Sequence, residues 1–266
     1  MGRIFVVGLL VVVLSLAGCG GGGGSAQQEQ GSGGSGQASC DLENPPLFEE
    51  GTLTVATDSP AFPPWFEGDL ENYSGFEGEV ANEVAERMDL PITWVVEPFN
   101  RSYAPGAKDF DFDINQITIT PERERAVDFS EGYFDNAQGV LALEDSPVAN
   151  ATTLSDLQGA NLGAQVGTTS LDFINETIQP EVEPSIYDTT NDAKSALEAG
   201  RIDAFVTDLV TTVYLRDVEI EGTKVVGQGP RNEQFGMLFE KGNPLVGCVN
   251  QALGEMKEDG ILEDLQ

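Results

Sequence analysis

Residues 109–130, with the sequence DFDFDINQITITPERERAVDFS, constrain the fold of this chain more than any other stretch. The stretch opens with an alternating pattern of apolar and β-branched residues, which is typical of a buried strand. The pattern breaks at Pro121, a residue that suits the first turn of a helix. Arg123 therefore follows the carboxyl end of a strand, and ligands usually bind at that edge of an open α/β sheet. With Thr118 just before it, the arginine offers a planar fork and a hydroxyl to a carboxylate.

The order of the predicted elements indicates an α/β fold that is built twice. Strands at 52–56 and 92–96, a helix at 76–88 between them, and a strand at 110–119 predict a parallel sheet with crossover helices. After 140–143 the pattern restarts with a short helix at 154–157, a strand at 161–165 and a helix from 167 to 178. A helix at 191–199 and a strand at 202–207 follow, with Asn191 or Asp192 as the N-cap of that helix. A strand at 236–239 and a helix at 244–265 would then return to the first part.

Six segments, in this order, carry a resemblance to a known family. They are LTVATDSPAFPPWF (53–66), GFEGEVANEVAERM (75–88), DFDINQITITPERERAVDFSEGYF (111–134), LSDLQGANLGAQVGTTS (154–170), LEAGRIDAFVTD (197–208), and the end from FGMLFEKGNPL to MKEDGILEDL. Together they resemble the extracellular family 3 solute-binding proteins, the amino-acid receptors of ABC importers. The resemblance implies a two-lobed periplasmic-binding-protein-like fold of type II, with a ligand cleft between the lobes and two hinge crossings. We expect lobe 1 at 40–138 and 235–266, and lobe 2 at 139–234.

The composition excludes several classes of function. The chain has 13 Lys and Arg against 45 Asp and Glu, a net charge of -32, which repels nucleic acid and anionic lipid. We interpret the charge as a solvated acidic surface. The absence of His removes Ser-His and Cys-His nucleophile systems and His metal sites. The sequence shows no metal motif and points to no cofactor.

The first 39 residues predict export and attachment to a membrane. Residues 1–18 combine Arg3 with an apolar run that is too short for a comfortable membrane span, as in a signal peptide. The residues Leu16-Ala17-Gly18-Cys19 resemble a lipobox, which implies that Cys19 becomes the acylated N-terminus. An ordinary cleaved signal with an incidental cysteine is the alternative. Residues 19–39 are a Gly, Ser and Gln-rich tether that cannot form a core.

Two further cysteines predict a disulfide. Cys40 begins the folded part, and Cys248 lies in the last helical segment. An exported protein is in an oxidising environment, and the count is even. We therefore predict a bond between them, with two free thiols as the alternative.

A free amino acid carries a carboxylate and an ammonium on one carbon, and the sequence offers a partner for each. Arg123 and Thr118 suit the carboxylate, and the turn that contains Thr168 and Thr169 adds amide groups and a hydroxyl at a helix N-terminus. Asp208, at the end of a lobe 2 strand, can accept from the ammonium. Closure of the lobes would then depend on the ligand.

The resemblance assigns the same roles to these residues and implies four more ligand contacts. Asp58 would accept from the amine or the side chain, Phe62 and Phe99 would be apolar walls, and a backbone carbonyl near Gln116 would contribute. The loop at 58–65 is one residue longer than the family pattern, which leaves Ala61 or Trp65 as alternatives to Phe62. At 100–108 the sequence NRSYAPGAK replaces the usual helix, and whether Arg101 enters the cleft stays open.

Each assignment competes with an ordinary structural role. Arg123 could pair with Glu122 or Glu124 on a surface helix. Asp58 and Asp208 could cap strand ends or turns, Thr168 and Thr169 could cap their helix, and Phe62 and Phe99 could be core residues.

The favoured function is a lipid-anchored receptor on the outer face of the cell membrane. It would bind a free amino acid, polar or cationic by preference, and deliver it to the membrane permease of an ABC importer, and we expect a monomer. The first alternative is an exported enzyme of the prephenate or cyclohexadienyl dehydratase kind, because one fold can host both functions. The second is a ligand-sensing subunit with a separate signalling partner.

Overall fold

The computed structural model describes residue 2, residue 40 and residues 45–266. Apart from residue 2, the predicted signal peptide, the tether and the acylation site Cys19 lie outside the described residues. None of the helices in the described part of the chain is both long and apolar enough to cross a membrane.

The first sheet has five strands in the order β2-β1-β3-β12-β4. Its strands are β1 (Leu53–Thr57), β2 (Ile92–Val96), β3 (Phe112–Asp113), β4 (Val127–Phe129) and β12 (Leu238–Glu240). Strand β1 pairs in parallel with β2 and β3, whereas β12 runs antiparallel to β3 and β4. The parallel pairing predicted for the first three strands is therefore confirmed. The returning C-terminal strand β12 adds an antiparallel side to the sheet, because it inserts between β3 and β4.

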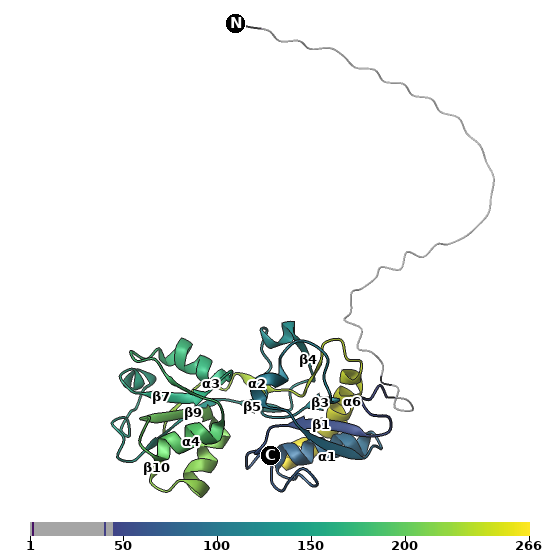
Figure 1. Cartoon of the computed structure of the whole chain (residues 1–266), viewed down its shortest axis with the longest axis horizontal. Coiled ribbons are helices and arrows are strands. Elements are labelled where there is room, and N and C mark those ends of the chain that lie inside the picture. The colour runs from purple at the N-terminus through teal and green to yellow at the C-terminus, as the bar shows by residue number, and fades with distance from the viewer. Residues whose placement is uncertain (1, 3–39, 41–44) are drawn as a thin grey trace, which may run out of the picture. The chain divides into compact units, whose positions relative to one another are not determined.

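Helices cover the first sheet with a continuous apolar core. The helical segments are α1 (Phe76–Arg87), α2 (Phe99–Ser102), the 3-10 helix η1 (Arg123–Arg125), α6 (Leu245–Glu258) and α7 (Ile261–Leu265). Val80 and Val84 of α1 and Val249 and Leu253 of α6 belong to one buried cluster with β1. Figure 1 shows these two helices, far apart in sequence, beside the same sheet.

The second sheet also has five strands, in the order β10-β6-β9-β7-β8. Its strands are β6 (Gln138–Leu143), β7 (Leu162–Gln165), β8 (Ser185–Tyr187), β9 (Ala204–Asp208) and β10 (Thr223–Gln228). Its helical segments are η2 (Leu154–Leu157), α3 (Thr169–Asp172), η3 (Phe173–Ile178), α4 (Thr190–Glu198), α5 (Leu209–Tyr214) and η4 (Leu215–Glu219). Val140 and Leu141 face opposite sides and join two different buried clusters. Because successive side chains of a strand alternate in direction, one short apolar strand contributes buried side chains to the clusters on both faces of the sheet.

Two strands connect the sheets and pair with each other. Strand β5 (Phe134–Asn136) lies in the chain between β4 and β6, and β11 (Glu233–Phe235) lies between β10 and β12. They form an antiparallel ladder in which Glu233 faces Asn136 and Phe235 faces Phe134. The chain thus has the two-lobed α/β architecture that the sequence predicts.

Three local predictions need correction. Residues 110–119 form a strand only at Phe112–Asp113, because the chain turns away to bridge β11 at Thr118. The N-cap of α4 is Thr189, whose side chain accepts from the Asp192 amide, since the helix begins at Thr190. The C-terminal helix is divided in two because Gly260 adopts a left-handed conformation with φ 78°.

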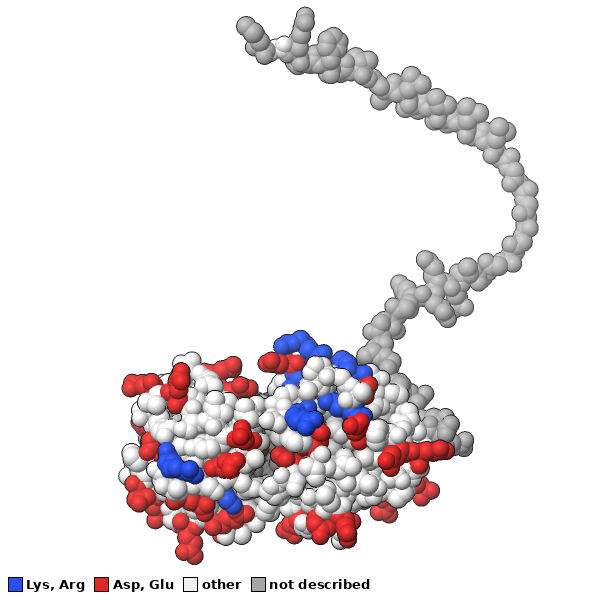
Figure 2. All heavy atoms as spheres, in the orientation of Figure 1, with Lys and Arg blue, Asp and Glu red and all other residues white. Residues whose placement is uncertain are grey.

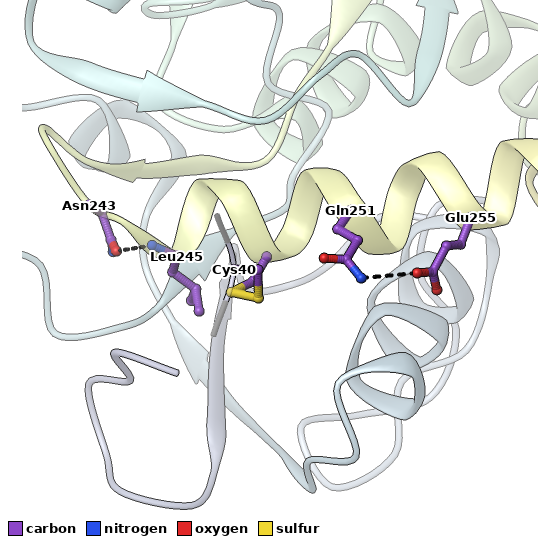
Figure 3. The surroundings of a disulfide bond; sticks show 6 residues. Cys40, Asn243, Leu245, Gln251 and Glu255 are labelled. Carbon is purple, nitrogen blue, oxygen red and sulfur yellow. Dashed lines mark hydrogen bonds between the residues drawn. A yellow bond between two sulfur atoms is a disulfide. The ribbon is translucent and has the colours of Figure 1, made fainter. Parts of the chain in front are cut away.

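A disulfide joins Cys40 to Cys248, the pair that the sequence predicts. Figure 3 shows Cys40 beside helix α6, near Leu245 and Gln251. Cys248 is buried in the core, and Leu47 packs against the same cluster. The backbone amide of Phe48 donates to Asp111 at 2.6 Å. The bond and these contacts attach the beginning of the described segment to lobe 1.

Acidic side chains are distributed in many small groups over the visible surface of the folded part (Figure 2). They occur over both lobes in this view, with fewer basic side chains among them. This distribution agrees with the interpretation of the charge as a solvated surface.

We predict that loss of the disulfide destabilises lobe 1. The bond closes a loop with a sequence separation of 208 residues, which in the chain-entropy account contributes up to about 5 kcal/mol. The double variant Cys40→Ser/Cys248→Ala should melt at a lower temperature than the oxidised protein in calorimetry. Reduced wild-type protein is the control and should match the variant; equal melting of oxidised protein and variant would contradict the prediction.

Candidate functional site

All nine residues that the sequence predicts as ligand contacts line one pocket between the two lobes. They are Asp58, Phe62, Phe99, Gln116, Thr118, Arg123, Thr168, Thr169 and Asp208. The pocket is also lined by the start of α4 at Thr189 and Thr190 and by Gln165 of β7. The first five and Arg123 come from lobe 1, and the remaining residues come from lobe 2.

Strand ends explain why these residues meet. Asp58 follows the carboxyl end of β1, and Asp208 is the last residue of β9. Thr168 and Thr169 follow β7 through the turn at Gly167. Because the ends of parallel strands gather at one edge of a sheet, each lobe presents its loops to the same cleft.

Arg123 is a buried cation, 7% exposed. Its Nη1 donates to the carbonyl of Thr118 at 2.7 Å, and its Nη2 donates to the carbonyl of Gly167 in lobe 2 at 3.0 Å. Within the described residues Arg123 forms no ion pair. The ion pair in this segment is exposed and joins Arg125 to Glu122. Burial lowers the pKa of Arg123, while nearby acidic groups oppose that shift. A surface arginine paired with Glu122 or Glu124 is therefore excluded.

Asp208 lines the same pocket and lies in a group of polar side chains. It accepts a hydrogen bond from Asn136 Nδ2 at 2.6 Å, and the same amide group donates to Glu233 Oε2 at 3.1 Å. Burial raises the pKa of Asp208 to about 7, and the charge of Glu233 adds to the shift. A cation placed beside such a carboxylate would stabilise its charged form.

The threonines of the site connect the lobes. Thr118 Oγ1 of lobe 1 lies 3.3 Å from Thr169 Oγ1 of lobe 2, and each donates to Glu233 on the crossing strand β11. Gln138 donates to Glu233 at 2.8 Å. Thr168 caps α3, because its Oγ1 accepts from the Leu171 amide at 3.2 Å. Glu233 therefore receives hydrogen bonds from both lobes.

Gln116 is held in place from behind by a buried acid. Its backbone has a positive φ of 48°, and its amide donates to Glu77 at 2.8 Å. Glu77, in the first turn of α1, also accepts from the Gln116 side chain and from the hydroxyl of Tyr133. Burial raises the pKa of Glu77 to about 7, although these hydrogen bonds oppose the shift.

The structure decides between the alternatives for the pocket wall. Phe62 lines the pocket, with Lys194 Nζ 5.7 Å from its ring centroid. Trp65 is 1% exposed in the lobe 1 core and donates from Nε1 to Thr211 at 2.9 Å. Ala61 packs against the same core. Arg101 does not line the pocket, since its side chain is 73% exposed and lies 3.9 Å from Glu97.

Asp58 remains at the lobe 1 side of the pocket. Its Oδ1 accepts from the Ser59 amide at 2.7 Å, and burial raises its pKa. In the described part of the chain, no group of three or more Asp, Glu, Cys or His is arranged to hold a metal ion.

Comparisons with known proteins identify the family. Residues 53–266 match the bacterial extracellular solute-binding proteins, family 3. The chain belongs to this family. The L-cystine-binding protein TcyJ of Escherichia coli K12 is 31% identical over 221 residues, which cover 82% of each chain.

Solved structures of related proteins have the same architecture. An ancestral arginine-binding protein bound to glutamine is 31% identical with a TM-score of 0.73, over 82% of this chain and 96% of its own. The ancestral amino acid-binding protein AncCDT-1, a precursor of cyclohexadienyl dehydratase, is 29% identical with a TM-score of 0.70, over 81% of this chain and 93% of its own. The family 3 protein described here therefore has the two-lobed type II fold.

Several residues of the site were missed in the sequence. Glu77 could have been found from the sequence, since it is an acid in the first turn of a helix inside a matched segment. Asn136, Gln138 and Glu233 could not, because only the pairing of β5 with β11 brings them together. Tyr103 lies in the segment that departs from the family pattern, so the resemblance could not assign it a role.

We predict that the ligand-free protein is more stable in mild acid than in mild base. Glu77 and Asp208 have a pKa of about 7 in the folded protein, against 4.5 and 3.8 ordinarily. Between those values the folded state binds protons that the unfolded chain does not, so stability falls as the pH rises towards 7. Each pKa unit corresponds to about 1.4 kcal/mol. The melting temperature should be higher at about pH 5.5 than at about pH 8.

The net charge of -32 also favours the acidic condition, so variants must separate the two causes. Asp208→Asn and Glu77→Gln should flatten the dependence on pH, whereas the exposed control Asp217→Asn should leave it unchanged. A pH profile that is the same in all three variants would contradict the assignment to Asp208 and Glu77.

Proposed function

We propose that this protein is an extracytoplasmic receptor that binds a free amino acid between its lobes and delivers it to an ABC importer. The buried guanidinium of Arg123 is the observation that carries the proposal. It has carbonyl partners but no ion pair among the described residues, and it lines the pocket. A buried cation of this kind is suited to a carboxylate ligand, with the Thr118 and Thr169 hydroxyls beside it.

The other end of the pocket suits the α-ammonium. Asp208 lies there with a pKa raised by burial and by Glu233. An ammonium bound beside Asp208 would stabilise the ionised carboxylate and receive a charge-assisted hydrogen bond. The two ends of a zwitterion would thus contact opposite charges that are contributed by different lobes.

The lining favours a polar or cationic side chain on the ligand. Asp58 adds a second carboxylate, and Arg123 is the only basic residue among the described ones that line the pocket. Phe62 and Phe99 would enclose the aliphatic part of the side chain. Similarity to proteins named for L-cystine and arginine supports the same class.

Closure of the lobes would occur at the two crossing strands. With lobe 1 at 40–138 and 235–266 and lobe 2 at 139–234, β5 and β11 lie at the boundaries. The ligand would contact Arg123 and Asp208 together only when the cleft is closed, so binding favours the closed form.

We further propose that the protein acts as a monomer attached to the membrane by lipid on Cys19 and passes its ligand to a permease. The sequence around Cys19 supports the anchor. A diacylated residue would hold the protein stably, since two chains suffice where one is marginal.

A dehydratase is the second candidate. Similarity to the precursor of cyclohexadienyl dehydratase and the pKa of about 7 at Asp208 support it, because a protonated acid can donate to a leaving hydroxyl. Turnover of prephenate by the purified protein would favour this candidate over the receptor.

The first test is a thermal-shift screen of the protein from Cys40 onward against the standard amino acids, L-cystine and prephenate. A ligand that binds only the folded state raises the melting temperature. We expect a shift with one or a few polar or cationic amino acids and no turnover of prephenate. A shift with none of the amino acids would overturn the receptor.

We predict that Arg123→Ala weakens binding of the amino acid found in the screen. Loss of one partner of a buried charge pair costs about 2–5 kcal/mol, so affinity should fall at least about tenfold in calorimetry. Arg125→Ala is the matched control, because it removes the same charge two residues away. The side chain of Arg125 is 73% exposed. Equal affinity of Arg123→Ala and wild type would exclude the proposed role.

We predict that Cys19→Ser releases the protein from the membrane. Without the thiol no lipid can be attached, so the full chain expressed in a bacterium should move from the membrane fraction to the soluble extracytoplasmic fraction. Cys40→Ser is the control, because it removes a cysteine and leaves the acylation site intact. Retention of Cys19→Ser in the membrane fraction would disprove the anchor.

A further inference from the structure

Tyr103 does not line the pocket, yet it contacts the residue on which recognition depends. It follows α2 in the segment NRSYAPGAK, where the chain departs from the family pattern. The guanidinium carbon of Arg123 lies 5.0 Å from the Tyr103 ring centroid and 5.5 Å from that of Phe99. The two rings meet edge to face at 6.0 Å. They therefore form an aromatic corner around the buried cation.

This corner restricts how Arg123 can turn. Aromatic faces attract a guanidinium without using its N–H groups. The carbonyls of Thr118 and Gly167 accept from Nη1 and Nη2. The side chain is thus held by rings and carbonyls, which leaves other N–H donors of the fork for a ligand carboxylate.

Tyr103 also reaches the other lobe. Its hydroxyl donates to the carbonyl of Gly167 at 3.4 Å, and the same carbonyl accepts from Arg123. Gly167 has a φ of +73°, and a Cβ at this residue would lie 2.0 Å from Tyr103 Oη. The turn before Thr168 and Thr169 therefore needs glycine for its backbone conformation and for contact with the tyrosine.

We infer that Tyr103 is a positioning residue for ligand binding. It holds Arg123 in the orientation that receives a carboxylate, and it secures the Gly167 turn of lobe 2 against lobe 1 when the cleft is closed. The inference rests on the proposed amino-acid receptor. A tyrosine that only fills space would act on stability and not specifically through Arg123 and Gly167.

The test measures affinity and dissociation rate for whichever of the standard amino acids or L-cystine gives the largest shift in the thermal screen. Tyr103→Phe keeps the ring and loses the hydroxyl, so dissociation should be about two- to fivefold faster. Tyr103→Leu loses both contacts and should weaken binding about tenfold. In an Arg123→Ala background, Tyr103→Leu should have little further effect, because the two residues act together.

Gly167→Ala gives a readout that a space-filling role would not produce. Alone it should weaken binding, because the new Cβ meets the Tyr103 hydroxyl. In that background Tyr103→Phe should strengthen binding, since the nearest remaining ring atom is Cζ at 3.3 Å. The effect of removing the hydroxyl would thus reverse in sign.

The outcomes separate the two proposals. If wild-type protein binds none of the standard amino acids and not L-cystine, the receptor and the role of Tyr103 both fail. If wild type binds and Tyr103→Phe and Tyr103→Leu bind equally well, only the role of Tyr103 fails. Absence of the sign reversal with Gly167→Ala would also overturn it. Tyr103→Phe, the milder change, keeps the test valid if Tyr103→Leu does not fold.

Discussion

The burial of one guanidinium between two lobes organises this protein. Arg123 comes from lobe 1, but one of its carbonyl partners belongs to Gly167 of lobe 2. A buried charge is costly unless hydrogen bonds and opposite charge surround it. The chain supplies the hydrogen bonds and two aromatic rings, while among the described residues no carboxylate pairs with it. In the proposed receptor, the carboxylate of the ligand would supply that opposite charge.

A second constraint acts at the crossing strands. Glu233 on β11 accepts hydrogen bonds from Thr118 of lobe 1, from Thr169 of lobe 2 and from Gln138 at the start of β6. Its charge adds to the effect of burial in raising the pKa of Asp208, which shares the Asn136 amide with it. The same carboxylate therefore connects the lobes and sets the electrostatics of the proposed ammonium site. Changes in the relative position of the lobes must alter the environment of both acids.

Some residues of the site could be predicted from the sequence, and others could not. Asp58 and Asp208 follow or end strands, and strand ends are visible as pattern breaks in a sequence. Arg123 was found from its matched segment, although the strand before it ends at Asp113. Phe62 was uncertain because loop length alone cannot say which of three neighbouring side chains turns inward, and Trp65 instead fills the core beside Phe235. Tyr103 was not found, because its contacts join residues 20 and 64 positions away along the chain.

The family, the two α/β lobes and the disulfide pairing follow from the sequence, since they depend on periodic apolar patterns, ordered motifs and the two cysteines that remain beyond Cys19. Tertiary structure alone decided the mixed first sheet, in which β12 returns to lie between β3 and β4. It also decided the surroundings of Arg123 and Glu233. The physical reason is that burial and charge coupling depend on which distant segments meet, and no local pattern encodes that distance.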